Sequence, residues 1–292
     1  MTIVEKSKEN WQLDLLDACF YNNLEKVNLL LFSPEYKEFV NLNFSDEKGT
    51  YDNPLLVCAY VGAFEILKIL LTSPELTEHS DIHYQNRYKE NALIIACKSG
   101  HLEIVQYLLR SSDLKEHSSI NSKDNKGNNI LLAACMGGNV SLVKYLVEDS
   151  LFKSYWGESQ INNDGNNLLI LAAGMASPEI IEYLIDEQNI TPIDLLHKNN
   201  QGEDILLYLC NHLYGKENGA FKELYIKSNK NKFENLIKYF LFDKNLNVSD
   251  YNLEYFENNK YDDVLELIRK KELKNKLDNV LKIDMNNKFK KI

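Results

Sequence analysis

A repeat with a period of 38 residues runs through this 292-residue chain. Four segments align without gaps, at residues 54–71, 92–109, 130–147 and 168–185. The second residue of each segment is a leucine: Leu55, Leu93, Leu131 and Leu169. A period of this size indicates a stack of supersecondary units, because one unit cannot bury its apolar face without neighbours. The repeat therefore predicts a solenoid and favours a binding function.

Each unit predicts a pair of helices. In the third unit, Asn91 precedes a helix over residues 92–99, and its side chain can cap the first turn. Gly100 ends this helix, because glycine takes the left-handed conformation at a helix C-terminus without a steric penalty. A second helix with a broad apolar face follows. The cap recurs at Asn53, Asn129 and Asn167, and the stop recurs at Gly62 and Gly138.

Between the two helices the sequence resembles a known family. The motif Gly-His-Leu-Glu-Ile-Val at residues 100–105 is the hallmark of ankyrin repeats. Residues 124–127 are similar to the family's Asp-x-x-Gly turn at the tip between units, and residues 162–165 and 199–202 match it more loosely. The resemblance implies an all-α ankyrin-repeat solenoid. The family's Thr-Pro-Leu-His opening is replaced here, as in Asn-Ala-Leu-Ile at 91–94, so apolar packing must substitute for its hydrogen bonds.

The units are about five residues longer than common ankyrin units. The extra residues follow the second helix, at 33–38, 73–79 and 111–117, and two of these segments begin Ser-Pro-Glu, a good helix start. They predict a short third helix after units one to four. This long form with Asn-rich turns resembles the ankyrin effectors of Legionella-type intracellular bacteria, and ankyrin proteins of protists share part of the resemblance. That resemblance implies a virulence protein moved into a host cell by type IV secretion.

The pattern diverges at both ends of the chain. It predicts an N-terminal capping unit at 1–40, regular repeats at 41–204, divergent repeats at 205–268 and a basic tail or helix at 269–292. In the sixth unit the first helix begins at Ile205, but the partner pattern begins at Leu236, so an insertion is expected near 211–230. Residues 253–268 predict a degenerate seventh unit that forms a helical C-terminal cap.

Composition and charge limit where the protein is expected to act and which classes of partner it is expected to bind. The chain is 44% hydrophobic and 26% charged, which is typical of a globular protein. Its apolar runs fall short of the roughly 18–20 residues that span a bilayer, and its start lacks the pattern of a secretory signal. We therefore expect a cytoplasmic protein, translocated if it is an effector. The net charge of −10 argues against nucleic-acid binding. Residues 269–292 carry a net charge of +6, so the tail is interpreted as a solvated helix, with a membrane contact, a partner contact or an export signal as alternatives.

Side chains that could carry chemistry have a structural explanation. All five cysteines fall at two small positions of the first helix, where helices pack closely. His79 and His117 occupy equivalent positions 38 residues apart, which repetition explains better than metal binding. Residues 162–166 suggest a calcium loop but lack its bidentate glutamate. We expect no cofactor, no metal and no enzyme activity. The alternatives are an active site within 205–292, or an adaptor with a second binding region in the insertion or the tail.

The favoured function is binding of a protein partner, suspected to be a host protein, by a monomer. Ankyrin repeats resemble one another in presenting the tips and the inner face of the first helices as a concave surface. The candidate partner-binding residues on that surface are Tyr60, Arg87, Tyr88, Glu90, Lys98, Ser99, Asn125, Lys126, Asn128, Met136, Asn163, Asp164, Asn166 and Met175. By residue type, Arg87 and Tyr88 are the best anchors.

Overall fold

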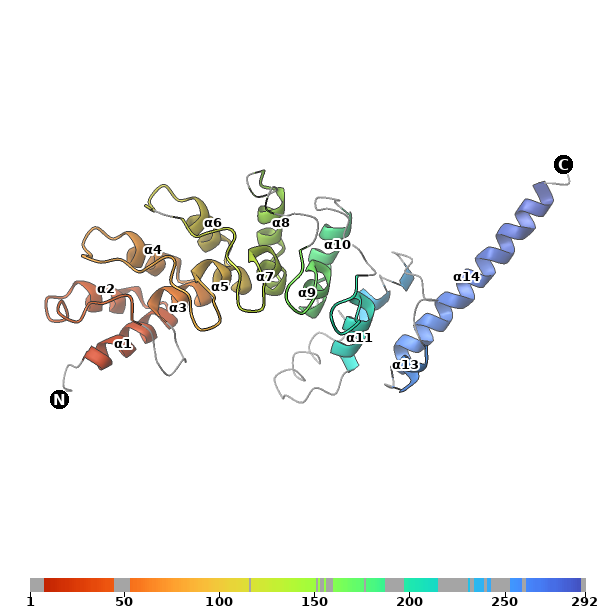
Figure 1. Ribbon diagram of the computed structural model, residues 1–292, viewed down its shortest axis with the longest axis horizontal. Helices are drawn as coiled ribbons and strands as arrows, with labels where there is room; N and C mark the ends of the chain where they lie inside the picture. Colours follow the sequence, from red (N-terminus) through yellow and green to blue (C-terminus); the bar gives the residue numbers. More distant parts are fainter. Residues whose placement is uncertain are drawn as a thin grey trace.

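The computed structural model describes residues 8–44, 53–115, 117–150, 152, 155, 160–175, 177–186, 197–214, 231, 234–238, 241–242, 253–258 and 261–289. Helices follow one another in pairs along an elongated stack, with the two termini at opposite ends (Figure 1). The pairs are α1 (Lys8–Phe20) with α2 (Leu24–Phe32), α3 (Pro54–Val61) with α4 (Phe64–Thr72), α5 (Ala92–Ser99) with α6 (Leu102–Arg110), α7 (Ile130–Gly137) with α8 (Val140–Glu148), and α9 (Leu168–Gly174) with α10 (Pro178–Asp186). The predicted all-α repeat fold is confirmed.

The first helices of successive units form the inner row of the stack. Helices α1, α3, α5, α7, α9 and α11 (Ile205–Tyr214) pack side by side, and α2, α4, α6, α8 and α10 form a second row (Figure 1). The leucines that define the repeat are all buried in the core, at equivalent places: Leu55, Leu93, Leu131 and Leu169. Each apolar face is therefore covered by the units on either side.

Local capping explains where the first helices begin and end. The side-chain oxygen of Asn91 accepts a hydrogen bond from the Ile94 N–H at 3.0 Å, and Gly100 closes α5 with a φ of 76°. Both predicted signals are therefore confirmed. The same cap is formed at Asn53, Asn129 and Asn167. In the first unit Asn22 takes the place of the glycine, with a φ of 50°. Asparagine is among the few residues other than glycine that accept this region.

The five cysteines lie in the core, as their positions in the repeat predicted. Each is a free thiol with no exposed surface. Burial raises the pKa of Cys135 to about 12 and raises the pKa values of Cys97 and Cys210 as well. Cys58 packs against Cys19, and burial followed by this neighbour raises its pKa too. A thiolate is the reactive form of cysteine, so the raised pKa values make Cys58, Cys97, Cys135 and Cys210 poor nucleophiles in the folded protein.

The predicted third helix after the helix pair is wrong for the first three units. Residues 33–39, 73–79 and the described part of 111–117 form turns. In the second unit Leu76 N–H bonds to Ser73 O, which closes a single turn. The chain then reverses, and Ser80 N–H bonds to Leu70 O at 2.9 Å. This return contact to the preceding helix leaves no residues for a further helical turn. The segment after the fourth unit lies mostly outside the described residues.

Helix α11 and the helical segments that follow it complete the described part of the stack. Helix α11 continues to Tyr214, so the first residues assigned to the insertion belong to this helix, while 215–230 lie outside the described residues. Residues 234–238 are helical, with Leu236 and Ile237 in the core. Helix α13 (Leu253–Asn258) and helix α14 (Asp262–Phe289) follow. Helix α14 runs through the basic segment without a break and projects away from the stack (Figure 1).

Candidate protein-binding surface

Four loops between the units share one hydrogen-bonding scheme. We call them the tip loops, at residues 86–90, 124–128, 162–166 and 199–203. In the second loop Asp124 Oδ1 accepts hydrogen bonds from the N–H groups of Lys126 at 2.9 Å and Asn128 at 2.8 Å. Gly127 closes the loop with a φ of 76°. The same two bonds form to the side-chain oxygens of Asn86, Asn162 and Asn199. One side chain at the first position therefore fixes the backbone of each tip loop.

Main-chain bonds join successive tip loops into one continuous row. Asn125 N–H donates to Tyr88 O at 2.8 Å, and Asn163 N–H donates to Lys126 O at 2.8 Å. Asn200 N–H donates in the same way to the carbonyl of residue 164 at 2.9 Å. The second and third positions of neighbouring loops are thus held next to one another. We call this ordered array of the four loops the tip row.

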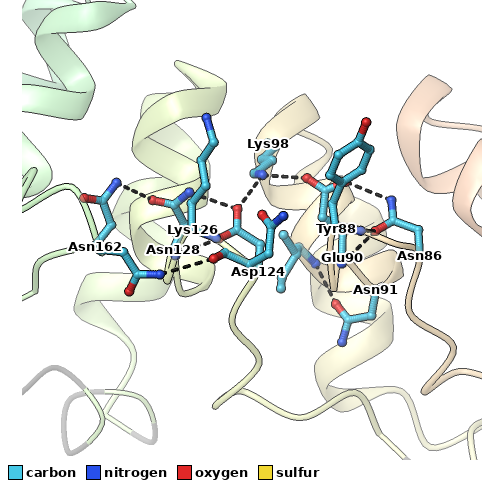
Figure 2. Close-up of polar contacts among 12 residues, drawn as sticks. Asn86, Tyr88, Glu90, Asn91, Lys98, Asp124, Lys126, Asn128 and Asn162 are labelled. Atoms are coloured by element: carbon cyan, nitrogen blue, oxygen red, sulfur yellow. Dashed lines mark hydrogen bonds and ion pairs between the residues drawn. The ribbon is translucent and has the colours of Figure 1, made fainter.

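Lys98 links the third unit to the fourth beneath the tip row. Its Nζ lies 2.6 Å from Glu90 Oε1 and 2.6 Å from Asp124 Oδ2 (Figure 2). The Asp124 side chain is 1% exposed, against 24% for Lys98. Burial opposes the charge on Lys98, but its hydrogen bonds to Asp124 and Glu90 outweigh burial and raise its pKa. Burial likewise opposes the charge on Asp124, while hydrogen bonds from Lys98 and Asn128 outweigh it and lower the pKa of Asp124.

Side-chain amides extend these contacts along the stack. Asn128 Nδ2 donates to Asp124 Oδ2, and Asn162 Nδ2 donates to Asn128 Oδ1, each at 2.9 Å (Figure 2). The amide of Asn199 repeats the second contact by donating to Asn166 Oδ1 at 2.9 Å. Because each amide bridges two units, these buried contacts fix the spacing of the tip loops.

The same contacts continue to the C-terminal helices. Asn199 Nδ2 donates to Glu203 Oε2 at 3.0 Å, and Asn211 Nδ2 donates to the other carboxylate oxygen of Glu203. Tyr261, which directly precedes α14, donates its hydroxyl to Asn211 Oδ1 at 2.7 Å. The network of polar side chains thus ties Tyr261, next to the start of α14, to the tip row.

Two side chains project outward from this framework on one side. Figure 2 shows the ring of Tyr88 and the ammonium group of Lys126 extending in the same direction, with Lys98 between them at a lower level. Tyr88 is 45% exposed, and the guanidinium of Arg87 lies 4.8 Å from its ring centroid. An aromatic ring, its stacked arginine and a lysine that forms no ion pair with the described residues therefore lie together on a backbone that hydrogen bonds hold in place.

The comparison with known families agrees with this geometry. The family model for ankyrin repeats, which comprises three copies, matches residues 15–116 and 112–194. This chain belongs to the ankyrin-repeat family. No curated protein matches it. Ankyrin repeats are generally modules for protein–protein interaction and typically serve as binding scaffolds without enzymatic activity. A protein partner is therefore the expected ligand of this ankyrin-repeat protein.

The predicted site residues of the ankyrin-repeat protein fall into three groups by exposure. The exposed ones are Tyr60, Arg87, Tyr88, Asn125, Lys126, Asn163, Asp164 and Met175. The half-buried ones are Glu90, Lys98, Ser99, Met136 and Asn166. Asn128 is 1% exposed, and its amide is occupied by Asp124 and Asn162, so its assignment to the binding surface is corrected. It belongs to the scaffold.

The predicted residues also differ in whether their side chains are hydrogen-bonded within the protein. Glu90 and Lys98 are held by one another, which gives both a structural role besides any contact with a partner. Tyr60 and Met175 lie outside the tip loops, at the C-terminal ends of α3 and α9. The carbonyl of Tyr60 contacts His101 Nε2 at 3.0 Å, so the turn histidine of the third unit binds the unit before it.

Register placed Arg87 and Tyr88 at the tip of the third unit, but the Asp-x-x-Gly motif that marks the turn in the fourth unit is not visible there. Asn86 replaces the expected aspartate, and Lys89 takes the place of the glycine with a φ of 59°. A spacing of eight residues between polar side chains is the sequence signal that could have indicated the contacts below the tips. It joins Glu90 to Lys98 and recurs between Glu203 and Asn211. The contact of Asn211 with Tyr261 spans 50 residues and has no local signal.

The two histidines that repeat in register, His79 and His117, make equivalent contacts in the turns after the second helices. His79 Nε2 contacts Ser73 O, and His117 Nε2 contacts Ser111 O, each at 2.9 Å. Repetition thus gives both side chains the same role in closing the turn after the second helix. Within the described ranges, no three His, Cys, Asp or Glu side chains converge as metal ligands do. Nor does any helix in those ranges have the length and apolar composition needed to cross a membrane.

Proposed function

We propose that this ankyrin-repeat protein binds a protein partner through the tip row of units three to five. The observation that carries the proposal is the contrast between framework and surface. The first position of each loop makes the same hydrogen bonds, while the second and third positions are Arg87-Tyr88, Asn125-Lys126 and Asn163-Asp164. A constant scaffold that carries variable exposed side chains is suited to selecting one partner.

Tyr88 is the central anchor of the proposed surface. It is rigid, amphipathic and 45% exposed, and its backbone is held by Asn86 and by the next tip loop. Tyrosine and arginine are enriched among the residues that dominate binding energies. Because the loop is already ordered, binding does not have to supply the free energy of ordering it.

A more specific proposal concerns what kind of protein the partner is. The long Asn-rich units resemble ankyrin effectors of intracellular bacteria, and this resemblance supports a host protein as the partner and action after translocation. A reporter enzyme fused to the chain tests this idea by its activity inside host cells. No reporter activity in host cells infected by bacteria with an intact secretion system would contradict the effector role while leaving the binding surface unaffected.

A matched pair of tyrosine variants tests the surface. Tyr88→Ala removes the anchor, and Tyr155→Ala removes a tyrosine of nearly equal exposure, 44%, in the turn region after α8. Partners captured by the wild-type protein are identified by mass spectrometry, and the purified partner is then titrated against each variant. We expect Tyr88→Ala to weaken binding by about 2 kcal/mol or more. The Tyr155→Ala control should bind as the wild type does.

Arg87→Ala and a deletion of residues 215–230 complete the test. The three point variants, at Tyr88, Tyr155 and Arg87, change exposed side chains, so their unfolding midpoints should match that of the wild type. Wild-type affinity in Tyr88→Ala, together with loss of binding in the deletion, would assign binding to the insertion. That result would favour the adaptor alternative and contradict the proposed surface.

A further inference from the structure

Cations are concentrated on the tips of units three and four, although the chain has a net charge of −10. Arg87, Lys89 and Lys126 are exposed, and Lys123 is exposed just before the second of these tips. None of the four forms an ion pair with a carboxylate of the described residues. Their charges are therefore available to a ligand.

The carboxylates of the same two loops are already occupied. Glu90 accepts hydrogen bonds from Asn86 Nδ2 and from Lys98, and Asp124 is almost completely buried against Lys98. Lys98 offsets one of these two negative charges, which leaves the exposed cations in excess. The next exposed acid on the tip row is Asp164, in unit five. The positive region is thus bounded at that unit.

The spacing of the units sets the form of a matching ligand. Packed helices of neighbouring units lie about 8–10 Å apart. An extended chain advances roughly 3.3 Å per residue, so about three residues span the distance from one tip to the next. Tyr88 and Lys126 project to the same side of adjacent tips (Figure 2). A straight segment lying along the row can therefore contact both.

We infer that the tip row binds an extended acidic segment of a partner protein. The segment places carboxylates about three residues apart, one near Arg87 and Lys89 and one near Lys126, with an apolar or aromatic side chain against Tyr88. This inference rests on the proposed binding surface and specifies the chemistry of its partner. Complementary charge and an aromatic anchor together give both orientation and specificity.

Selection from a random library of 16-residue peptides tests the inference without a known partner. The wild-type protein is compared with the double variant Arg87→Gln/Lys126→Gln. A control, Lys37→Gln/Lys115→Gln, removes the same charge from exposed lysines in the turns after α2 and α6. Thermal unfolding verifies that all three proteins are folded.

We expect the wild type and the control to enrich peptides rich in Asp and Glu, and the tip variant to lose this enrichment. A synthetic peptide from the selection should bind about tenfold more weakly when its carboxylates become amides. Its affinity should also fall as salt shortens the Debye length from about 10 Å at 0.1 M.

Enrichment of neutral or basic peptides, no enrichment, or acidic enrichment that persists in the tip variant would overturn the inference. If non-acidic peptides bind the wild type but not Tyr88→Ala, the proposed surface stands and only its acidic preference fails. If no tip substitution alters binding, both proposals fail.

Discussion

Replacing Lys98 by methionine tests whether the contacts below the tip row stabilise the stack. Methionine keeps an unbranched stem of similar length and a high helix propensity, so the change removes mainly the ammonium group. Exposed ion pairs contribute less than about 1 kcal/mol, whereas breaking a buried pair costs about 3–5 kcal/mol. Asp124 is 1% exposed but keeps hydrogen bonds from the Lys126 and Asn128 N–H groups and from the Asn128 amide. We therefore expect a loss of about 2 kcal/mol, between these limits.

A double-mutant cycle isolates the interaction of Lys98 with Asp124. Asp124→Asn is suitable because Asn162 closes its own tip loop with the same two hydrogen bonds. The free energy of unfolding is measured by urea titration for the wild type, both single variants and the double variant. We expect a coupling energy of about 1–2 kcal/mol. A coupling below about 0.5 kcal/mol would refute the inference that this pair joins units three and four.

The pH dependence provides a second check. Because the pKa of Asp124 is lowered in the folded protein, its contribution is present above the unfolded value of about 3.9. That contribution is lost as pH falls through the lower folded value. The cost of Lys98→Met should therefore shrink below about pH 4. The raised pKa of Lys98 has the opposite sign, so its contribution persists up to about pH 10.4 and is lost as pH rises through the folded value. A cost that does not change across the acid range would contradict the assignment to Asp124.

Three further substitutions test the packing of the stack by unfolding measurements. Gly137→Ala should lower the free energy of unfolding by about 1–3 kcal/mol. A Cβ at this position would lie 2.4 Å from Cys97 O, a backbone atom that cannot move aside independently. An unchanged unfolding midpoint would show that α5 and α7 can separate freely. Asn91→Ala should cost about 1–2 kcal/mol through loss of the α5 cap, and a cost equal to that of a surface change would contradict this role. Cys135→Ala should cost at most about 1.5 kcal/mol, and Cys135 of the wild type should react with a thiol reagent only on unfolding; rapid reaction of the folded protein would contradict its burial.

The regular units could be predicted because their signals are local. Asn91 and Gly100 each act within one helical turn, so the bounds of α5 follow from neighbouring residues. The prediction of a third helix after the first three helix pairs was wrong for a physical reason. Ser73 followed by Pro and Glu does start a turn, but the bond from Ser80 N–H back to Leu70 O ends it. A helix-start signal cannot reveal that the chain must return to the preceding helix.

The candidate surface could be located in outline but not in its internal contacts. Register placed Tyr88 and Lys126 on the tips, because tip positions repeat with the units. Burial of Asn128 could not be read from its residue type, since it depends on the amide of Asn162 in the next unit. The contact between Asn211 and Tyr261 likewise arises only when distant segments pack.

In each tip loop, the residues that close the loop are different from the residues that are exposed to a partner, and this separation has an evolutionary consequence. The loop is closed by the side chain at its first position and by main-chain groups, and Arg87, Tyr88 and Lys126 contribute no side-chain hydrogen bond to that closure. Substitutions at these positions therefore have little effect on folding, so selection for a stable fold does not remove them. Such a chain can change its partner through substitutions at a few exposed positions, whereas substitutions of the capping asparagines or buried leucines would destabilise the fold. Among descendants of this protein, binding specificity should diverge sooner than the repeat framework.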